Sequence, residues 1–230
     1  MERYAVYFAP RRDSALHGFG TSWLGWDSDI AQPVPQPVAA DIDPAELRRF
    51  TQAPRRYGFH GTLKPPFRLR EGTNFDDLQA AAAALAKDLY PVEIGRLRLK
   101  RLSRFLALIP ERHSTALQDL AGRCVMELDR FRAPAPPEET ERRRKAGLSA
   151  RQEDLLTQWG YPYVLDQFRF HLTLTGSLDE PDLARVEAYL SNVISPVLEE
   201  PVTLADLCIF GDPGEGESCR IVARIPVGAV

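Results

Sequence analysis

Two short segments of the chain carry a histidine followed two residues later by a threonine, at His60 and Thr62 and again at His171 and Thr173. The first segment reads RYGFHGTLK over residues 56–64, and the second reads FRFHLTLT over residues 168–175. Apolar and polar side chains alternate in both, which is typical of β-strands with one buried face. Each strand is therefore predicted to present an imidazole and a hydroxyl on one face.

These groups suit acid–base chemistry on a phosphodiester. One neutral histidine can take a proton from the attacking water or hydroxyl while the other, protonated, gives one to the leaving oxygen, because histidine titrates near the working pH. Either histidine could be the base. The threonines can bond the non-bridging oxygens, and strand alternation adds two cations. We predict His60 and His171 as catalytic, with phosphate bound by Thr62, Thr173, Lys64 and Arg169. The chemistry requires neither a metal nor another cofactor.

Other residues near these segments have open roles. Tyr57 and Trp23 are predicted to line the substrate, although Trp23 lies in a glycine-rich segment, 17–26, whose aromatics could equally pin a loop to the core. Lys64 and Arg169 could instead be solvated strand ends. The basic run Arg142–Lys145 is more typical of a solvated surface than of a ligand site.

The pattern His-x-Thr is weak alone, since His113-Ser114-Thr115 also fits it. That copy lies at an expected helix start, where Ser114 or Thr115 is better explained as a cap, so we exclude it. His17 is interpreted as a loop residue. No Asp or Glu lies at metal-ligand spacing around His60 or His171, which argues against a metallohydrolase.

Composition limits the partners. The 230 residues are 44% apolar, and 29 basic against 32 acidic residues give a net charge of −3. This balance favours a small phosphorylated substrate over long nucleic acid or an anionic membrane. Three widely spaced cysteines, together with the lack of a signal-like or membrane-spanning apolar run, indicate a cytoplasmic protein. We expect a monomer.

The order of expected elements repeats. An opening strand, a loop over 17–26 and a helix over 44–51, closed by Pro54, precede a strand over 57–64 and a helix over 74–90. Strands over 92–100 and 105–109 and a helix over 114–131 follow. After a charged bridge and a helix over 149–160, the remaining elements are a strand over 167–175, a helix over 179–194, and strands over 202–210 and 219–226. This repetition predicts an internal duplication that places the two histidines equivalently.

The paired segments resemble the two-histidine (2H) phosphoesterase superfamily, and the stretches RYGFHGTLKPPF, RYAVYFAP and WLGWD resemble its branch found with bacterial phosphonate-degradation (carbon–phosphorus lyase) genes. The resemblance implies an α+β, bilobal fold with antiparallel sheets and a cleft between pseudo-symmetric lobes. We expect one domain over 1–230, with lobes at about 1–131 and 161–230, a linker and helix at 132–160, and possible strand exchange. The resemblance also implies action on cyclic or 2′–5′ phosphodiesters, such as a ribose cyclic phosphate.

Two other functions stay open at this point. An RNA-end cyclic phosphodiesterase or ligase-like enzyme would need an extended basic groove, which the mildly acidic composition does not indicate. A non-catalytic nucleotide-binding module would keep the cleft without turnover, but both His-x-Thr copies are intact.

Overall fold

The computed structural model describes residues 1–145, 147–214 and 216–228. Its main antiparallel sheet has the strand order β11-β10-β1-β4-β8-β7-β6. These strands are β1 (Arg3–Phe8), β4 (Gly61–Phe67), β6 (Leu97–Leu102), β7 (Phe105–Pro110), β8 (Leu172–Thr173), β10 (Asp206–Asp212) and β11 (Arg220–Pro226). Two smaller pairs join β2 (Trp26–Asp27) to β3 (Gln32–Pro33) and β5 (Val92–Gly95) to β9 (Val202–Leu204). The predicted α+β class is confirmed.

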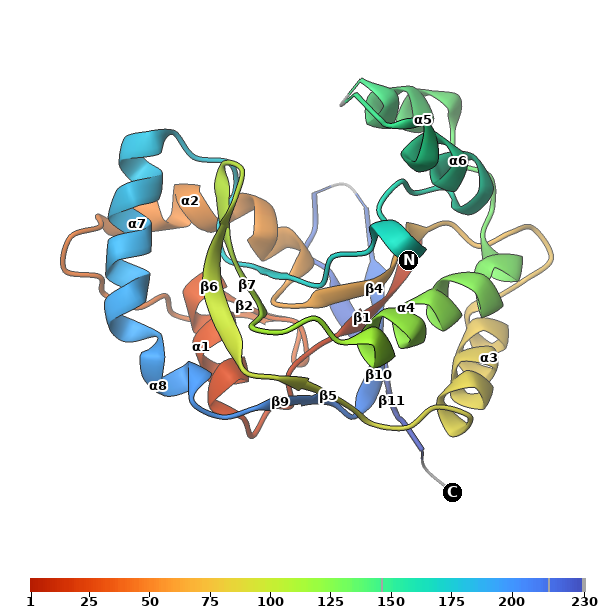
Figure 1. Ribbon diagram of the computed structural model, residues 1–230, viewed down its shortest axis with the longest axis horizontal. Coiled ribbons are helices and arrows are strands. Elements are labelled where there is room, and N and C mark those ends of the chain that lie inside the picture. Colours follow the sequence, from red (N-terminus) through yellow and green to blue (C-terminus); the bar gives the residue numbers. More distant parts are fainter. Residues whose placement is uncertain (146, 215, 229–230) are drawn as a thin grey trace.

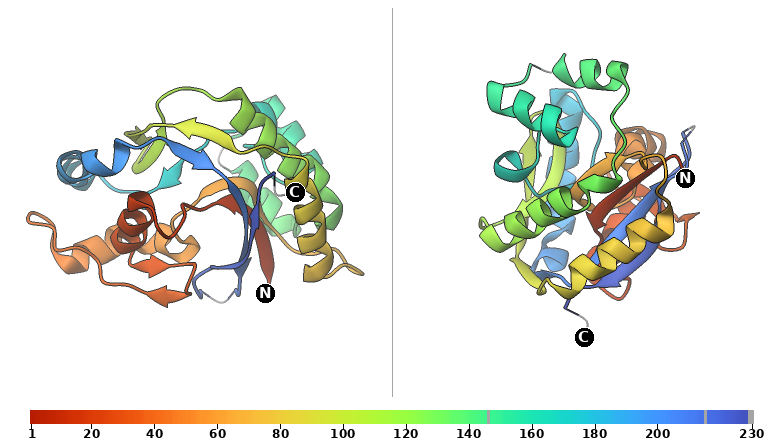
Figure 2. Two further views of the ribbon diagram at one scale, coloured as in Figure 1. Left: turned by 90° about the horizontal axis from the view of Figure 1, so that it is seen from below. Right: turned by 90° about the vertical axis from the view of Figure 1, so that its right-hand side faces the viewer.

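The helices form groups at the two ends of the sheet (Figure 1). At one end lie α1 (Ala15–Leu24), α2 (Pro44–Tyr57), α7 (Glu180–Val193) and α8 (Ser195–Leu198), and at the other lie α3 (Phe75–Lys87) and α4 (Thr115–Glu127). The pair α5 (Pro137–Arg144) and α6 (Ala150–Trp159) stands out from the body in Figures 1 and 2. Short 3-10 turns cover Asp129–Phe131 and Leu165–Gln167. Among the described helices, none has the length and apolarity needed to cross a bilayer.

The main sheet interleaves the two ends of the chain. The C-terminal hairpin β10–β11 joins β1, while the hairpin β6–β7 from the first half joins β8. The strands β4 and β8, which carry the two His-x-Thr segments, meet at the pair Gly61–Leu172. The internal duplication and the lobe boundaries stay predictions, but the strand order brings the two motifs together in one sheet.

Helix α2 continues through Pro54, contrary to the predicted end before this residue. A proline inside a helix leaves the carbonyl four residues earlier without its usual N–H partner. Here that carbonyl belongs to Phe50, and it accepts a hydrogen bond from the backbone N–H of Gly176 at 2.7 Å. The freed carbonyl therefore ties α2 to the segment that follows β8, and the helix runs on to Tyr57.

The glycine-rich segment 17–26 is largely helical, which corrects the predicted loop. Ser14 caps the start of α1 by accepting a hydrogen bond from the His17 N–H, and Gly25, at φ 75°, ends the helix. Gly20 allows α1 to pack closely against Phe59, the residue before His60. A Cβ at position 20 would lie 2.0 Å from the Phe59 ring. The glycines that suggested an irregular loop thus let α1 approach the first motif closely.

Two glycines of α1 should respond oppositely to alanine. Gly20→Ala is expected to cost about 1–3 kcal/mol of stability, because the new methyl group meets the Phe59 ring. Gly18→Ala, two residues away with nothing within 4 Å of its Cβ position, should stabilise by about 0.5–1 kcal/mol, since alanine is the better helix former. Urea denaturation of both variants measures the difference. Equal effects at the two positions would contradict this packing.

Candidate active site

The two motifs lie side by side at the centre of the main sheet. The antiparallel pair Gly61–Leu172 sets His60 opposite Thr173 and Thr62 opposite His171 when its register is continued by one residue in each direction. All four side chains then share one face, with the histidines as diagonal neighbours, for which roughly 7–8 Å is usual. The arrangement is that of the predicted pair of imidazoles across a small gap.

A close contact holds the two strands together behind the histidines. A Cβ on Gly61 would lie 2.5 Å from the ring of Phe170, so only glycine fits beneath this ring. Phe170 is buried and packs against Phe8 of β1, with ring centroids 5.7 Å apart. The apolar face predicted for each strand thus forms the core below the motif.

Both imidazoles are fixed through the same ring nitrogen. His60 Nδ1 lies 2.9 Å from the Gly58 carbonyl oxygen, and His171 Nδ1 lies 2.8 Å from the Arg169 carbonyl oxygen. A carbonyl only accepts, so Nδ1 carries the proton in each ring and Nε2 of the neutral form keeps its lone pair. Thr62 Oγ1 lies 3.3 Å from His60 Nε2. Nε2 is therefore the nitrogen of each neutral ring that can accept a proton.

Aromatic rings surround His60. Tyr7 stacks on its imidazole with centroids 3.8 Å apart, and Phe210 lies 5.9 Å away. Burial lowers the pKa of His60 to about 4; the Gly58 carbonyl opposes this shift and the charge of His171 adds to it. His60 is therefore neutral near pH 7. On the other motif, the ring centroid of Phe105 lies 6.0 Å from that of His171.

The stacking residue Tyr7 was missed by sequence reasoning. It lies on β1 opposite Thr62, and the alternation of the opening strand was the signal that could have found it. Nothing in the sequence alone indicates that β1 is the neighbour of β4, so the face of Tyr7 could not be connected with His60.

Lys64 does not lie with the other site residues. Its ammonium Nζ is 3.0 Å from the Val125 carbonyl oxygen and 3.1 Å from Asp129 Oδ1, and the side chain is 2% exposed. A β-bulge causes the difference: Thr62 pairs with Tyr7 but Lys64 pairs with the adjacent Val6, so strict alternation ends between them. The predicted phosphate-binding role of Lys64 is contradicted, because its cation is already bonded under α4.

Trp23 is also a core residue. It is 1% exposed, and its Nε1 donates a hydrogen bond to the Leu174 carbonyl oxygen at 2.9 Å. The predicted substrate-lining role of Trp23 is therefore contradicted. Its hydrogen bond instead ties α1 to the residue that follows β8.

Arg169 lies on the His171 side of the site, and Tyr57 lies on the His60 side. Arg169 is exposed, donates to the neighbouring Phe168 carbonyl and lines a cavity together with His171. Tyr57 packs against the cluster that contains Tyr7 and Phe210, on the His60 side. Their predicted contacts with substrate stay predictions.

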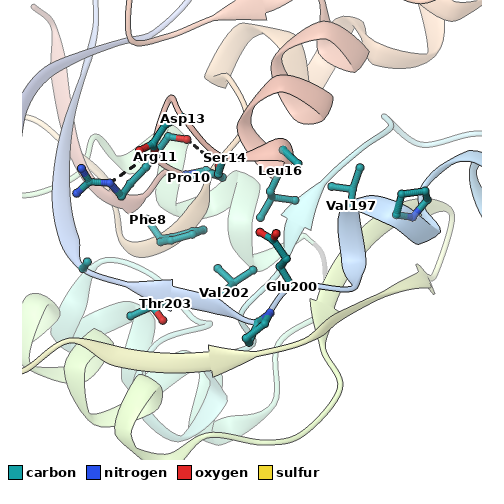
Figure 3. A pocket seen from close by; sticks show the side chains of 14 residues that line it. Phe8, Pro10, Arg11, Asp13, Ser14, Leu16, Val197, Glu200, Val202 and Thr203 are labelled. Carbon is teal, nitrogen blue, oxygen red and sulfur yellow. Dashed lines mark hydrogen bonds and ion pairs between the residues drawn. The ribbon is translucent and has the colours of Figure 1, made fainter.

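The cavities differ in their distance from the motifs. One, of about 650 Å³, opens beside His171. Two others, of about 320 Å³ and about 300 Å³, are lined by neither His60 nor His171. The cavity of about 320 Å³ is lined by Phe8, Leu16 and Val202 among others (Figure 3). Phe8 follows Tyr7 along β1 and so points to the opposite face of the strand. The cavity of about 650 Å³ is therefore the one next to the candidate chemistry.

Two members of the basic run have carboxylate partners. Arg143 pairs with Glu139, and Arg144 pairs with Glu141 and Glu153. These contacts tie α5 internally and to α6, which agrees with an ion-paired surface at Arg142–Lys145.

A protein-family model described as "Protein of unknown function (DUF1045)" matches residues 62–220, a span that includes Thr62 and the whole second motif. The chain belongs to the DUF1045 family. In this DUF1045 protein the strands that carry the two His-x-Thr segments adjoin within one antiparallel sheet, as the resemblance to 2H phosphoesterases predicts.

Two curated relatives of the DUF1045 protein are called "Ribose 1,5-bisphosphate phosphokinase PhnN". The one from Janthinobacterium sp. (strain Marseille) is 43% identical over 79% of this chain and 40% of its own length. The one from Laribacter hongkongensis (strain HLHK9) is 35% identical over 99% of this chain and 53% of its own length. The chain thus spans about half or less of these relatives, and their name describes the longer proteins.

Two solved structures have a weak overall similarity to the DUF1045 protein. Escherichia coli LigT complexed with 3′-AMP has a TM-score of 0.45 and 11% identity, and a structure called "Crystal structure of phosphoesterase" has a TM-score of 0.42 and 13% identity. Each match covers 99% of both chains.

Proposed function

We propose that this DUF1045 protein is a metal-independent phosphodiesterase that opens a small cyclic or 2′–5′-type phosphodiester with two histidines. The observation that carries the proposal is the symmetric fixing of both imidazoles, each bonded through Nδ1 to the carbonyl two residues earlier, on strands that meet at Gly61–Leu172. This leaves two Nε2 atoms and two threonine hydroxyls on one face, and acid–base cleavage of a phosphodiester needs these groups.

The environment of His60 favours the role of general base. Stacked on Tyr7 and with its pKa lowered to about 4 by burial, the imidazole is neutral and its Nε2 can accept a proton from water. The water oxygen then bonds to phosphorus, one ester P–O bond breaks, and protonated His171 gives its Nε2 proton to the leaving oxygen. Thr62 and Thr173 donate hydrogen bonds to the non-bridging oxygens as negative charge builds there. Solvent then restores the two protonation states.

Substrate identity is part of the proposal. The name of the curated relatives contains ribose 1,5-bisphosphate, and the chain carries a net charge of −3 rather than a strong positive charge. A ribose cyclic phosphate in phosphonate metabolism fits both better than long RNA does. We further propose that the protein works as a cytoplasmic monomer without a cofactor.

A screen of cyclic phosphodiesters with and without a chelator tests the function. We expect 2′,3′-cyclic nucleotides or a ribose cyclic phosphate to be hydrolysed at a rate that EDTA does not change, because no step uses a metal. Loss of activity on chelation, restored by a divalent metal, would instead indicate a metallohydrolase. Failure to hydrolyse any cyclic or 2′–5′ diester would contradict the enzyme class.

The pH dependence tests which histidine is the base. His60 must be neutral to accept a proton, and its pKa is about 4. On the acid side we therefore expect kcat/KM, which reports the free enzyme, to stay level until the pH drops through about 4. An acid limb near the ordinary histidine value of about 6.5 would show that His60 is not the base.

A further inference from the structure

The cavity beside His171 has a wall of basic side chains drawn from separate parts of the chain. Arg98 comes from β6, Arg112 and His113 from the turn between β7 and α4, and Arg169 from the second motif. The cavity of about 650 Å³ also includes His171 itself. A molecule held by this wall would therefore touch the catalytic histidine.

The positive charge of this wall is not neutralised within the protein. Among the described residues, Arg98, Arg112 and Arg169 have no carboxylate within ion-pair distance, whereas Arg101 on the same β6 strand pairs with both Glu180 and Glu187. Glu111 is the one carboxylate among the lining residues. Three guanidinium groups against a single carboxylate favour an anionic ligand, and guanidinium matches phosphate oxygens with two parallel hydrogen bonds.

The cavity also has apolar lining residues. They include Leu102, Ile109, Leu117, Phe168 and Phe170. The 13-residue helix α4 begins at this cavity, and the start of a helix carries a partial positive charge that adds to that of the arginines. Apolar and cationic side chains lining one cavity suit a sugar ring that bears a phosphate.

We propose that this cavity binds a second anionic group of the substrate, a phosphomonoester on the same sugar as the cyclic diester, through Arg98 and Arg112. The inference rests on the proposed function and extends it to a substrate class, phosphorylated sugar cyclic phosphates. It also gives the segment around His113, excluded above as a His-x-Thr motif, a place beside the substrate.

Matched substrates test this proposal. Ribose cyclic phosphate is compared with its 5-phosphorylated form, and we expect the phosphorylated form to have at least a tenfold higher kcat/KM, mainly through a lower KM. In the double variant Arg98→Ala/Arg112→Ala this preference should fall at least tenfold. Arg70→Ala removes an exposed arginine outside the cavity and should keep the preference. Equal kcat/KM for both substrates in the wild-type protein would overturn the proposal while leaving the proposed function standing.

A binding measurement separates the cavity from the chemistry. Calorimetric titration with ribose 5-phosphate is expected to show binding to the wild-type protein and to Arg70→Ala, weakened at least tenfold in the double variant. This result would support the anion site even if no cyclic diester were hydrolysed. Unchanged affinity in the double variant, with the fold confirmed by circular dichroism, would overturn the assignment of the two arginines.

Discussion

His60→Ala and His171→Ala are each expected to lower the turnover of a cyclic phosphodiester by at least about a hundredfold, which is the usual contribution of a positioned acid or base. The expectation rests on two features. In each ring Nδ1 is bonded to a backbone carbonyl, which makes Nε2 the nitrogen available for proton transfer; in His60 it is contacted by Thr62 Oγ1. The two motifs also adjoin at Gly61–Leu172, so one phosphate can contact both rings. Steady-state kinetics on the best substrate of the screen measures the loss.

Controls separate a chemical effect from a structural one. Thr62→Ala should cost less than either histidine variant, because it removes one hydrogen bond and no proton transfer. Thr115→Ala, the threonine of the excluded third copy, lies at the start of α4 and should leave turnover unchanged. Near-ultraviolet circular dichroism checks the fold of each variant. Wild-type turnover in either histidine variant would show that the assigned roles are wrong.

Asp129→Ala is expected to destabilise the protein by about 3 kcal/mol or more. Lys64 is 2% exposed and, among the residues that the structure describes, its ammonium is hydrogen-bonded to Asp129 Oδ1 and the Val125 carbonyl oxygen alone. Removing the carboxylate leaves a buried charge without its counter-ion, and breaking buried pairs in this way costs about 3–5 kcal/mol. Arg132 also loses its two bonds to Asp129. Urea denaturation at pH 7 measures the change in the free energy of unfolding.

Lys64→Met provides the matched comparison. It removes the cation but leaves Asp129 paired with Arg132, so we expect a smaller cost of about 1–2 kcal/mol. The double variant Lys64→Met/Asp129→Ala should be more stable than Asp129→Ala alone, because it leaves no buried ammonium without a counter-ion. Turnover per folded molecule should remain near that of the wild-type protein. A Lys64→Met variant of full stability but without activity would instead restore the phosphate-binding role that the structure contradicts.

Strand periodicity predicted the site because His60, Thr62, His171 and Thr173 are each part of a local alternating pattern. The same rule failed at Lys64, since a bulge set by the pairing with β1 turns its side chain under α4. A bulge depends on the neighbouring strand, and the neighbour is not encoded in the segment itself. The cationic cavity was likewise invisible, because Arg98, Arg112 and Arg169 approach one another only in the folded chain.

Residue propensity failed where tertiary contacts replace local ones. Pro54 should end a helix, but Gly176 supplies the hydrogen bond that the Phe50 carbonyl would otherwise lack. Gly18 and Gly20 should disfavour a helix, but Gly20 makes room for the Phe59 ring. In both cases the partner lies in another part of the sequence, and these partners support the two histidine strands.

The pairing of β4 with β8 makes the site depend on contacts between segments that are far apart in the sequence. Gly61 and Leu172 are distant in sequence, and β1 pairs with β10, which comes much later in the sequence. Such high contact order slows folding, because the entropy of loop closure is lost before the stabilising contacts form. Neither motif alone supplies both imidazoles, so during synthesis the proposed site can form only after the segment around His171 has left the ribosome.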